Sequence, residues 1–295
     1  MSKEVISNLK KQILDLHTQV SNLKEFVNSL DFSNYIIDQN SIIMDINSKS
    51  WPQAVEPALI CDPNNESEKI ERSKGIIEVY LDDSIKDKKV LDFGCGEGHL
   101  ISAASEFAPK TVIGYDIVQN NSWSSFKLSE NQKLTTSWDD VLAHAPYDFV
   151  VAFDVFDHLE NESPVACLKK IKSVMNSNSK LYVRFHPYCS RHATHLYQGL
   201  NKAFIHLFLT DEEIKQQYPD LKPTICQKVT RPLATYEKYI QESGFKVLNR
   251  REVTENVEDF FATPERSKII CKNLEFDSFP KFQLGLCFVD YVLKF

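Results

Sequence analysis

Three glycines and an acid form the first group of residues whose types and spacing point to chemistry. Apolar residues run into Asp92, and Gly94, Gly96 and Gly98 follow it, with the small Cys95 between the first two. Glycine is favoured where the backbone turns sharply or lets a ligand come close. A strand, a glycine turn and a helix start together make a nucleotide-sized cradle at the carboxyl edge of a parallel sheet. We therefore expect these five residues to bind a ligand.

The spacing of this turn separates it from better-known phosphate sites. The glycines read G-x-G-x-G rather than G-x-G-x-x-G, and no Lys-Ser/Thr pair follows them. A second acid, Asp116, stands roughly twenty residues after the glycines, at the end of the apolar run 111–117. An acid at that place can accept both hydroxyls of a ribose. We expect Asp116 and the adjacent Ile117 to contact an adenosine.

Another acid pair, with a histidine, follows the apolar run 147–153. Asp154, Asp157 and His158 stand in a D-x-x-D-H arrangement. The pKa of an imidazole suits it to remove a proton from a substrate, and Asp157 is placed to orient His158. Two carboxylates and a histidine are also ligands that a divalent ion takes, with His186 or His195 as a further donor.

Basic and aromatic residues are concentrated after the expected strand 181–185. Because ligands bind at the carboxyl edge of such sheets, we expect this loop to line a substrate site. His186 is a third candidate catalytic residue beside Asp157 and His158. The expected substrate-binding residues are Tyr188, Arg191, His192 and His195.

These motifs carry a resemblance to a known family. The Asp92 to Gly98 stretch resembles motif I of the class I S-adenosylmethionine (SAM) methyltransferases, and Asp154-x-x-Asp157-His158-Leu159 resembles the end of their motif IV. The resemblance covers about residues 70–295. It implies an α/β fold with a doubly wound, seven-stranded, mostly parallel Rossmann-like sheet, and SAM as the cofactor.

Further cofactor contacts follow from the same resemblance. It implies that Asp139 accepts from the adenine amine, that Trp138 packs on the ring, and that Phe153 and Asp154 lie near the methyl donor. A helix N-cap at Ser137 or Asp139 is an equally good interpretation of this segment, and both can hold.

The expected elements alternate as such a sheet requires. The last strand should insert antiparallel beside the neighbour of strand six. We expect strands at 89–93, 111–117, 133–137, 147–153, 181–185, 245–250 and 282–293, helices at 67–81, 97–107, 120–130, 140–144, 163–175 and 233–243, a turn at 176–179 and a substrate-specificity insertion at about 188–230.

Residues 5–30 carry a heptad pattern with Ile or Val at every a position and Leu at every d position. β-Branched a residues with Leu at d favour a parallel two-stranded coiled coil, so we expect self-association, with a dimer as its form. A single amphipathic helix packed on its own domain is the alternative. We divide the chain into a coiled-coil helix at 1–31, a lid or linker segment at 32–68 and the methyltransferase domain at 69–295.

Net charge, the length of the apolar runs and the cysteine content argue against several classes of protein. The 295 residues carry a formal net charge of −7, which disfavours nucleic-acid binding. No apolar run is long enough to cross a membrane, and seven cysteines without a C-x-x-C pair fit reduced thiols. We expect a cytoplasmic protein.

The expected reaction is methyl transfer from SAM to a hydroxyl of a small molecule or saccharide, with a histidine as base. Strand four lacks the Asn/Asp-Pro-Pro-Tyr/Phe ending of amide N-methyltransferases. One alternative is a metal-assisted RNA 2′-O-methyltransferase that uses Asp154, Asp157 and His158. We prefer a metal-free site. In the metal-binding methyltransferases that this motif resembles, Glu stands at both acid positions, and the Asp residues found here are shorter. Another alternative is a non-catalytic, oligomeric SAM-binding scaffold.

Overall fold

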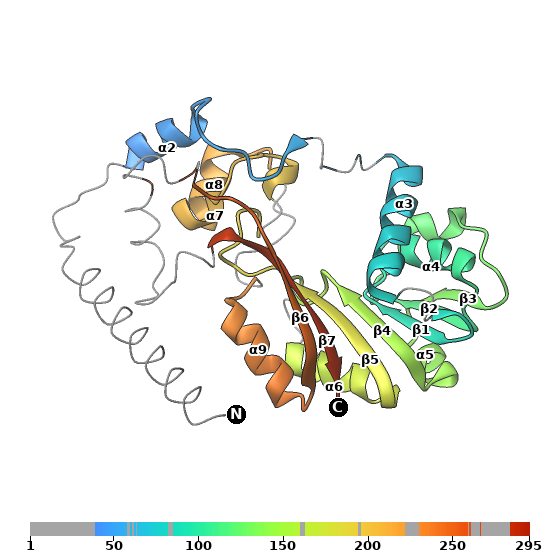
Figure 1. The fold of residues 1–295 in the computed structure, drawn as a ribbon. Helices are drawn as coiled ribbons and strands as arrows, with labels where there is room; N and C mark the ends of the chain where they lie inside the picture. Colours follow the sequence, from blue (N-terminus) through green and yellow to red (C-terminus); the bar gives the residue numbers. More distant parts are fainter. Residues whose placement is uncertain are drawn as a thin grey trace, which may run out of the picture.

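The fold is taken from a computed structural model (Figure 1), which describes residues 39–57, 60, 62, 64–81, 85–159, 163–193, 196–221, 230–258, 260, 266 and 284–295. Three expectations lie outside the described residues: the heptad segment 5–30, the role of His195, and the part of the insertion at 222–229.

The described residues form one seven-stranded sheet in the order β3-β2-β1-β4-β5-β7-β6. The first five strands are parallel to one another, and β7 is antiparallel to both β5 and β6. This confirms the expected doubly wound sheet and the antiparallel insertion of the last strand. The strands are β1 (Lys89–Phe93), β2 (Thr111–Tyr115), β3 (Gln132–Thr135), β4 (Tyr147–Phe153), β5 (Met175–Phe185), β6 (Lys246–Thr254) and β7 (Leu286–Lys294).

Helices cover both faces of the sheet, because successive strand residues point to opposite sides. Val90 of β1 packs with the layer of α3, η2 and α4, whereas Leu91 packs with the layer of α5, α6 and α9. The helical elements are α2 (Gln39–Asn47), α3 (Glu66–Ile76), the π-helical η2 (Ile77–Leu81), α4 (His99–Ala103), the 3₁₀ turns η4 (Ala104–Phe107), η5 (Asn121–Ser125) and η6 (Leu196–Gln198), α5 (Trp138–His144), α6 (Pro164–Lys172), α7 (Ile205–Phe208), α8 (Asp211–Gln217) and α9 (Leu233–Glu242).

The helix expected at 120–130 is wrong, since only the short η5 forms there. Asn120 accepts a hydrogen bond from the backbone N–H of Ser122, and the Ser122 hydroxyl donates to the Glu97 carbonyl. Short polar side chains that bond locally compete with the helical backbone. The segment packs on the glycine turn instead, where Trp123 Nε1 donates to the Gly96 carbonyl at 2.8 Å.

The turn expected at 176–179 lies inside β5 as an irregularity. The pairing of β4 with β5 passes from Tyr147–Met175 directly to Phe149–Lys180, so β5 carries extra residues there. The Ser179 hydroxyl donates to the Tyr147 carbonyl and accepts from Asn176 N–H. These side-chain bonds replace the missing ladder bonds and let the strand continue through a polar stretch.

A second core lies beyond the end of the sheet at which β7 begins, where Figure 1 shows α2, α7 and α8 together. Trp51 is at its centre, with its ring edge-on to Phe208 at 5.0 Å and its Nε1 donating to the Ala203 carbonyl at 3.0 Å. The segment before α3 and the segment after β5 therefore pack as one unit. Among the described residues no helix has the length and apolar character needed to cross a membrane.

Candidate active site

The glycine turn joins β1 to α4 through three residues in the left-handed region. Gly94, Gly96 and Gly98 have φ values of 80°, 51° and 86°. A Cβ added to Gly94 would lie 2.4 Å from Val155 Cγ2, whereas a Cβ on Gly96 would have nothing within 4 Å. Glycine at 94 is thus required for close packing, and glycine at 96 leaves the turn open to a ligand.

Asp116 follows β2 and closes the turn from the side. Its Oδ2 accepts from the backbone N–H of Gly96 at 2.8 Å, and its Oδ1 accepts from Val118 N–H at 3.2 Å. The next two side chains, Ile117 and Val118, are 68% and 66% exposed. The carboxylate of Asp116 could accept hydrogen bonds from a ribose, and the exposed apolar side chains beside it could cover the flat base of the same nucleoside.

Asp92 lies at the end of β1 and is only 6% exposed. Burial, reinforced by the negative charge of Asp116, raises the pKa of its carboxyl to about 7. A cationic ligand group would relieve both effects, because it would stabilise the ionised carboxylate. The amino end of SAM is such a group, so Asp92, the open turn and Asp116 fit this cofactor.

Trp138 and Asp139 lie in the first turn of α5. Ser137 is the N-cap of that helix and accepts from Asp140 N–H, so the capping interpretation holds for Ser137. The Trp138 ring contacts Phe93 and Tyr115, the residues before Gly94 and Asp116, and the Lys170 ammonium lies 4.5 Å from its centroid. Asp139 is exposed.

Phe153 and Asp154 end β4 beside the turn. The Phe153 ring lies edge-on to Tyr80 at 5.0 Å, and the Arg184 guanidinium lies 4.9 Å from its centroid. Asp154 has a φ of 57°, an unfavourable conformation for a residue with a Cβ. The conformation is held by an ion pair, in which His186 Nε2 lies 2.9 Å from Asp154 Oδ1.

Both ring nitrogens of His186 face acceptors. Nδ1 lies 3.2 Å from the Cys287 carbonyl, which can only accept, so Nδ1 carries a proton. Burial lowers the pKa of His186, but the charge and hydrogen bond of Asp154 together with the charge of Asp157 outweigh it and raise the pKa overall. Both contacts therefore favour the protonated ring over the neutral one.

Asp157 differs from what the sequence suggests. Asp157 is 0% exposed, and neither of its carboxylate oxygens has a hydrogen-bond partner among the described residues, so no hydrogen bond from Asp157 to His158 orients that ring. Burial raises the pKa of Asp157, opposed by the nearby His186 cation. His158 is exposed on the turn that follows β4.

A metal could be held at this place by a partly different set from the one expected. Ligand atoms of Asp154, Asp157 and His186 lie within 4.8 Å of one another, so the two acids and the expected further donor His186 come together, whereas His158 is not part of this group. Two carboxylates and an imidazole suit Mg²⁺ or Mn²⁺, and a cation would satisfy the buried oxygens of Asp157.

Some residues of the loop after β5 pack in or next to the second core, and others lie beside the candidate site. The Tyr188 hydroxyl donates to the His206 carbonyl at 3.4 Å, and Arg191 donates to the carbonyls of Gln53 and Asn256 at 2.7 and 3.1 Å. Among the expected substrate-binding residues that the structure describes, His192 lies beside the acid–histidine group, with its ring 5.5 Å from that of His186.

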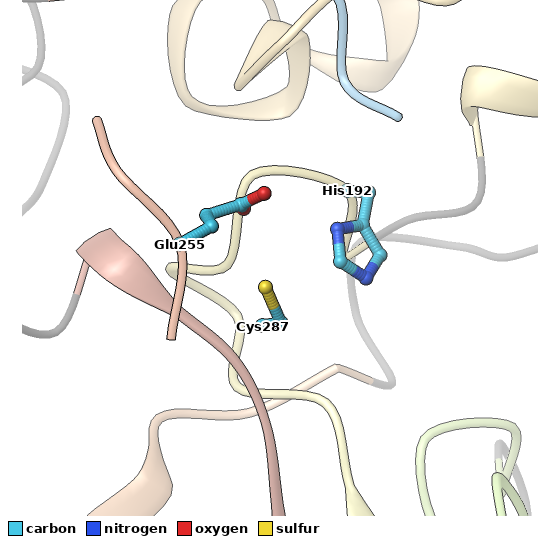
Figure 2. A group of neighbouring side chains, drawn as sticks. All are labelled: His192, Glu255 and Cys287. Atoms are coloured by element: carbon cyan, nitrogen blue, oxygen red, sulfur yellow. The ribbon is translucent and has the colours of Figure 1, made fainter. Parts of the chain in front are cut away.

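Two residues that sequence reasoning did not single out also lie here. Glu255 follows β6 and Cys287 belongs to β7, and both lie beside His192 (Figure 2). Burial, with the charge and a hydrogen bond of Glu255, raises the pKa of the Cys287 thiol to about 12. No local motif marks these residues, since each comes from a different segment of the chain.

Comparison with known proteins places these features in a family. The profile of a family described as a methyltransferase domain matches residues 66–249, more than half of the chain. A tRNA U34 carboxymethyltransferase of Campylobacter fetus subsp. fetus (strain 82-40) is 24% identical over 194 residues. That match covers 61% of this chain and 65% of the relative, so the chain spans slightly less than two thirds of the relative's length.

Solved structures with a similar fold include two methyltransferases. A SAM-dependent methyltransferase from Archaeoglobus fulgidus is 18% identical with a TM-score of 0.47, over 77% of this chain and 94% of that one. The magnesium protoporphyrin IX methyltransferase of Synechocystis PCC 6803, with bound SAH, is 15% identical with a TM-score of 0.45, over 79% and 89% of the two chains.

The region matched by the family profile begins with α3 and ends within β6. It contains the glycine turn, Asp116 and both members of the Asp154–His186 pair. The chain therefore belongs to the methyltransferase domain family.

Proposed function

We propose that this protein is a SAM-dependent methyltransferase and that it transfers the methyl group to a hydroxyl of a small molecule or saccharide. The observation that carries the proposal is the acid–histidine group next to the glycine turn, in which Asp154, Asp157 and His158 follow β4 and His186 follows β5. A hydroxyl must lose its proton as it accepts a methyl group, so such a site needs acid–base residues.

The cofactor would be held by residues already described. Asp116 would accept from the ribose, Asp92 would face the amino end, and the open backbone at Gly96 would let the ligand approach. Ile117 offers an apolar surface for the base, and Asp139 is placed in the first turn of α5 for its exocyclic amine. When bound, SAM supplies a methyl group already activated on a sulfonium.

We assign the base to His158 rather than to His186. His186 keeps one nitrogen on the Cys287 carbonyl and the other on Asp154, so it has no nitrogen left for a substrate proton. His158 is exposed on the turn that follows β4, so its ring is accessible to a substrate. His186 then acts as a positioning residue that holds Asp154.

A metal-assisted reaction on RNA is the second candidate. The buried, unpartnered oxygens of Asp157 favour a cation, and the relative from Campylobacter fetus is named for a tRNA modification. The net charge of −7 argues against a broad RNA interface.

A methyl-transfer screen with labelled SAM tests the proposal. Phenols, saccharides and tRNA are offered with and without EDTA, and label in a phenol or saccharide that persists in EDTA is the expected result. Label confined to tRNA, or abolished by EDTA, would favour the second candidate.

Variants test the assignment of the base. His158→Gln should lower kcat by about 10²–10⁴-fold with SAM affinity unchanged, the range typical of a lost general base. His186→Gln should also disturb binding, because Asp154 loses its partner. A His158→Gln enzyme with wild-type kcat would refute the assignment.

We also propose that the protein is cytoplasmic and that it forms a dimer through residues 5–30. The seven cysteines without a C-x-x-C pair fit reduced thiols, which supports the cytoplasmic location. The unbroken heptad pattern supports the dimer.

A further inference from the structure

Three side chains outside the proposed acid–base group converge beside it. His192 comes from the loop after β5, Glu255 follows β6, and Cys287 belongs to β7. One ligand atom of each, a nitrogen, an oxygen and a sulfur, lies within 4.8 Å of the other two. Figure 2 shows the three side chains directed toward one shared space.

The backbone around these residues is tied together. Glu255 N–H donates to the Gly285 carbonyl at 2.9 Å, which extends the pairing of β6 with β7 past its last register pair. Arg191, the neighbour of His192, donates to the carbonyl of Asn256, the neighbour of Glu255, at 3.1 Å. The three segments are therefore held in place by bonds that do not use the three side chains.

We infer that His192, Glu255 and Cys287 form a binding site for a zinc-type divalent cation. A thiolate, an imidazole and a carboxylate are the ligand types that Zn²⁺ takes, and three protein ligands leave a fourth position open. Mg²⁺ and Ca²⁺ prefer oxygen ligands, so the sulfur separates this site from the one at Asp154 and Asp157.

Distance and charge are compatible with this ion. Metal–ligand bonds of about 2.0–2.3 Å place tetrahedral ligand atoms about 3.3–3.8 Å apart, so small side-chain rotations close the observed group around a metal. A thiolate and a carboxylate balance the two charges of the cation. Arg191 adds a positive charge nearby, but its guanidinium already donates to two carbonyls.

The site adjoins the acid–histidine group without sharing its side chains. The contact of Cys287 with His186 at 3.2 Å is made by its backbone carbonyl, not by the thiol. A cation here would join the loop after β5 to the ends of β6 and β7. The zinc site does not depend on which acceptor the enzyme methylates.

Metal analysis of the full-length, untagged protein tests the inference. Wild-type protein dialysed against zinc and then against metal-free buffer should retain one Zn²⁺ per chain. Cys287→Ala, His192→Gln and Glu255→Gln should each weaken zinc binding by about 100-fold or more, because loss of an outer partner alone costs 10–100-fold. Cys189→Ala, on the same loop as His192, is the matched control and should retain the metal.

Cobalt substitution distinguishes the two neighbouring groups. Co²⁺ bound through Cys287 should give a sulfur-to-cobalt charge-transfer band that Cys287→Ala removes, with circular dichroism confirming that each variant folds. A cobalt complex without that band, full zinc retention in all three ligand variants, or no retained metal in the wild type would each overturn the inference.

Discussion

The ionisation of single residues decides how the cofactor end of the site works. Asp92 and Asp116 are both acids at the ends of neighbouring strands, yet their surroundings differ. Asp116 accepts two backbone hydrogen bonds, whereas Asp92 is buried with a pKa raised to about 7. Asp92 is thus poised to change charge near neutral pH, and a cationic ligand group would draw it into the ionised form.

SAM affinity should therefore depend on pH through Asp92. Between pH 5.5 and 7.5 the carboxyl of the ligand-free protein loses its proton, so affinity should rise by about an order of magnitude. The stability of the ligand-free protein should change in the opposite direction. Because the pKa of Asp92 is raised in the folded state, its carboxyl contributes stability at low pH, and that contribution is lost as pH rises from about 4 through about 7. Calorimetric titration and thermal melts over this range measure both effects.

Asp92→Asn is the control for this prediction. The variant should bind SAM more weakly at pH 7.5 and show a nearly flat affinity across the range. An unchanged slope in the variant would assign the pH dependence to another group.

At the scale of elements, three strand ends build the site together. β4 delivers Asp154 in a left-handed conformation, β5 delivers His186, and β7 supplies the Cys287 carbonyl that fixes the His186 ring. The antiparallel β7 is locked to β5 by an ion pair in which Arg184 Nε lies 2.7 Å from Asp290 Oδ1, and Tyr80 also bonds to Asp290. The last strand, which lies between β5 and β6, therefore contributes to the candidate site as well as to the sheet.

The glycine turn allows a matched pair of substitutions. Gly94→Ala should cost about 2–5 kcal/mol, because a left-handed alanine is strained and its Cβ meets the β-branched Val155. Gly96→Ala carries only the strain of about 1–2 kcal/mol, but its Cβ enters the open space at the turn and should weaken SAM binding at least about tenfold. Thermal melts and calorimetric titration measure the two effects.

The outcome distinguishes two roles for the glycines. Equal losses of melting temperature in both variants, or wild-type SAM affinity in Gly96→Ala, would mean that Gly96 does not face the cofactor.

At the scale of the whole molecule, two cores are joined by the loop after β5. The sheet core holds the cofactor end, and the second core holds Trp51 together with α7 and α8. Arg191 links them, since it donates to Gln53 from the segment before α3 and to Asn256 after β6. A substrate that enters beside His192 would thus meet residues from both halves of the chain.

Self-association belongs to this scale as well. The double variant Leu16→Glu and Leu23→Glu places charges at two d positions, so it should reduce the mass found by light scattering to that of one chain. SAM binding should persist, because the glycine turn belongs to the sheet. Gln12→Glu with Gln19→Glu, at flanking positions, is the control. An unchanged mass in the Leu double variant would favour the single amphipathic helix.

Local sequence patterns predicted several strands and helices of the fold correctly. The apolar runs of β1 and β4 form strands with the expected bounds. Prediction failed at 120–130, where Asn and Ser bond to nearby backbone, and the polar 176–179 forms part of β5 rather than a turn. Both segments depend on contacts that periodicity does not record.

The sequence by itself determined the order of strands and helices, the glycine turn and the acid at 116, because each rests on local spacing and on general rules of sheet topology. Only the tertiary structure decided which groups face one another. The left-handed backbone at Asp154 brings that acid to His186, and the carboxylate of Asp157 is buried without a hydrogen-bond partner in the described part of the chain. The grouping of His192, Glu255 and Cys287 depends on β7 lying between β5 and β6, a long-range pairing that no local pattern encodes.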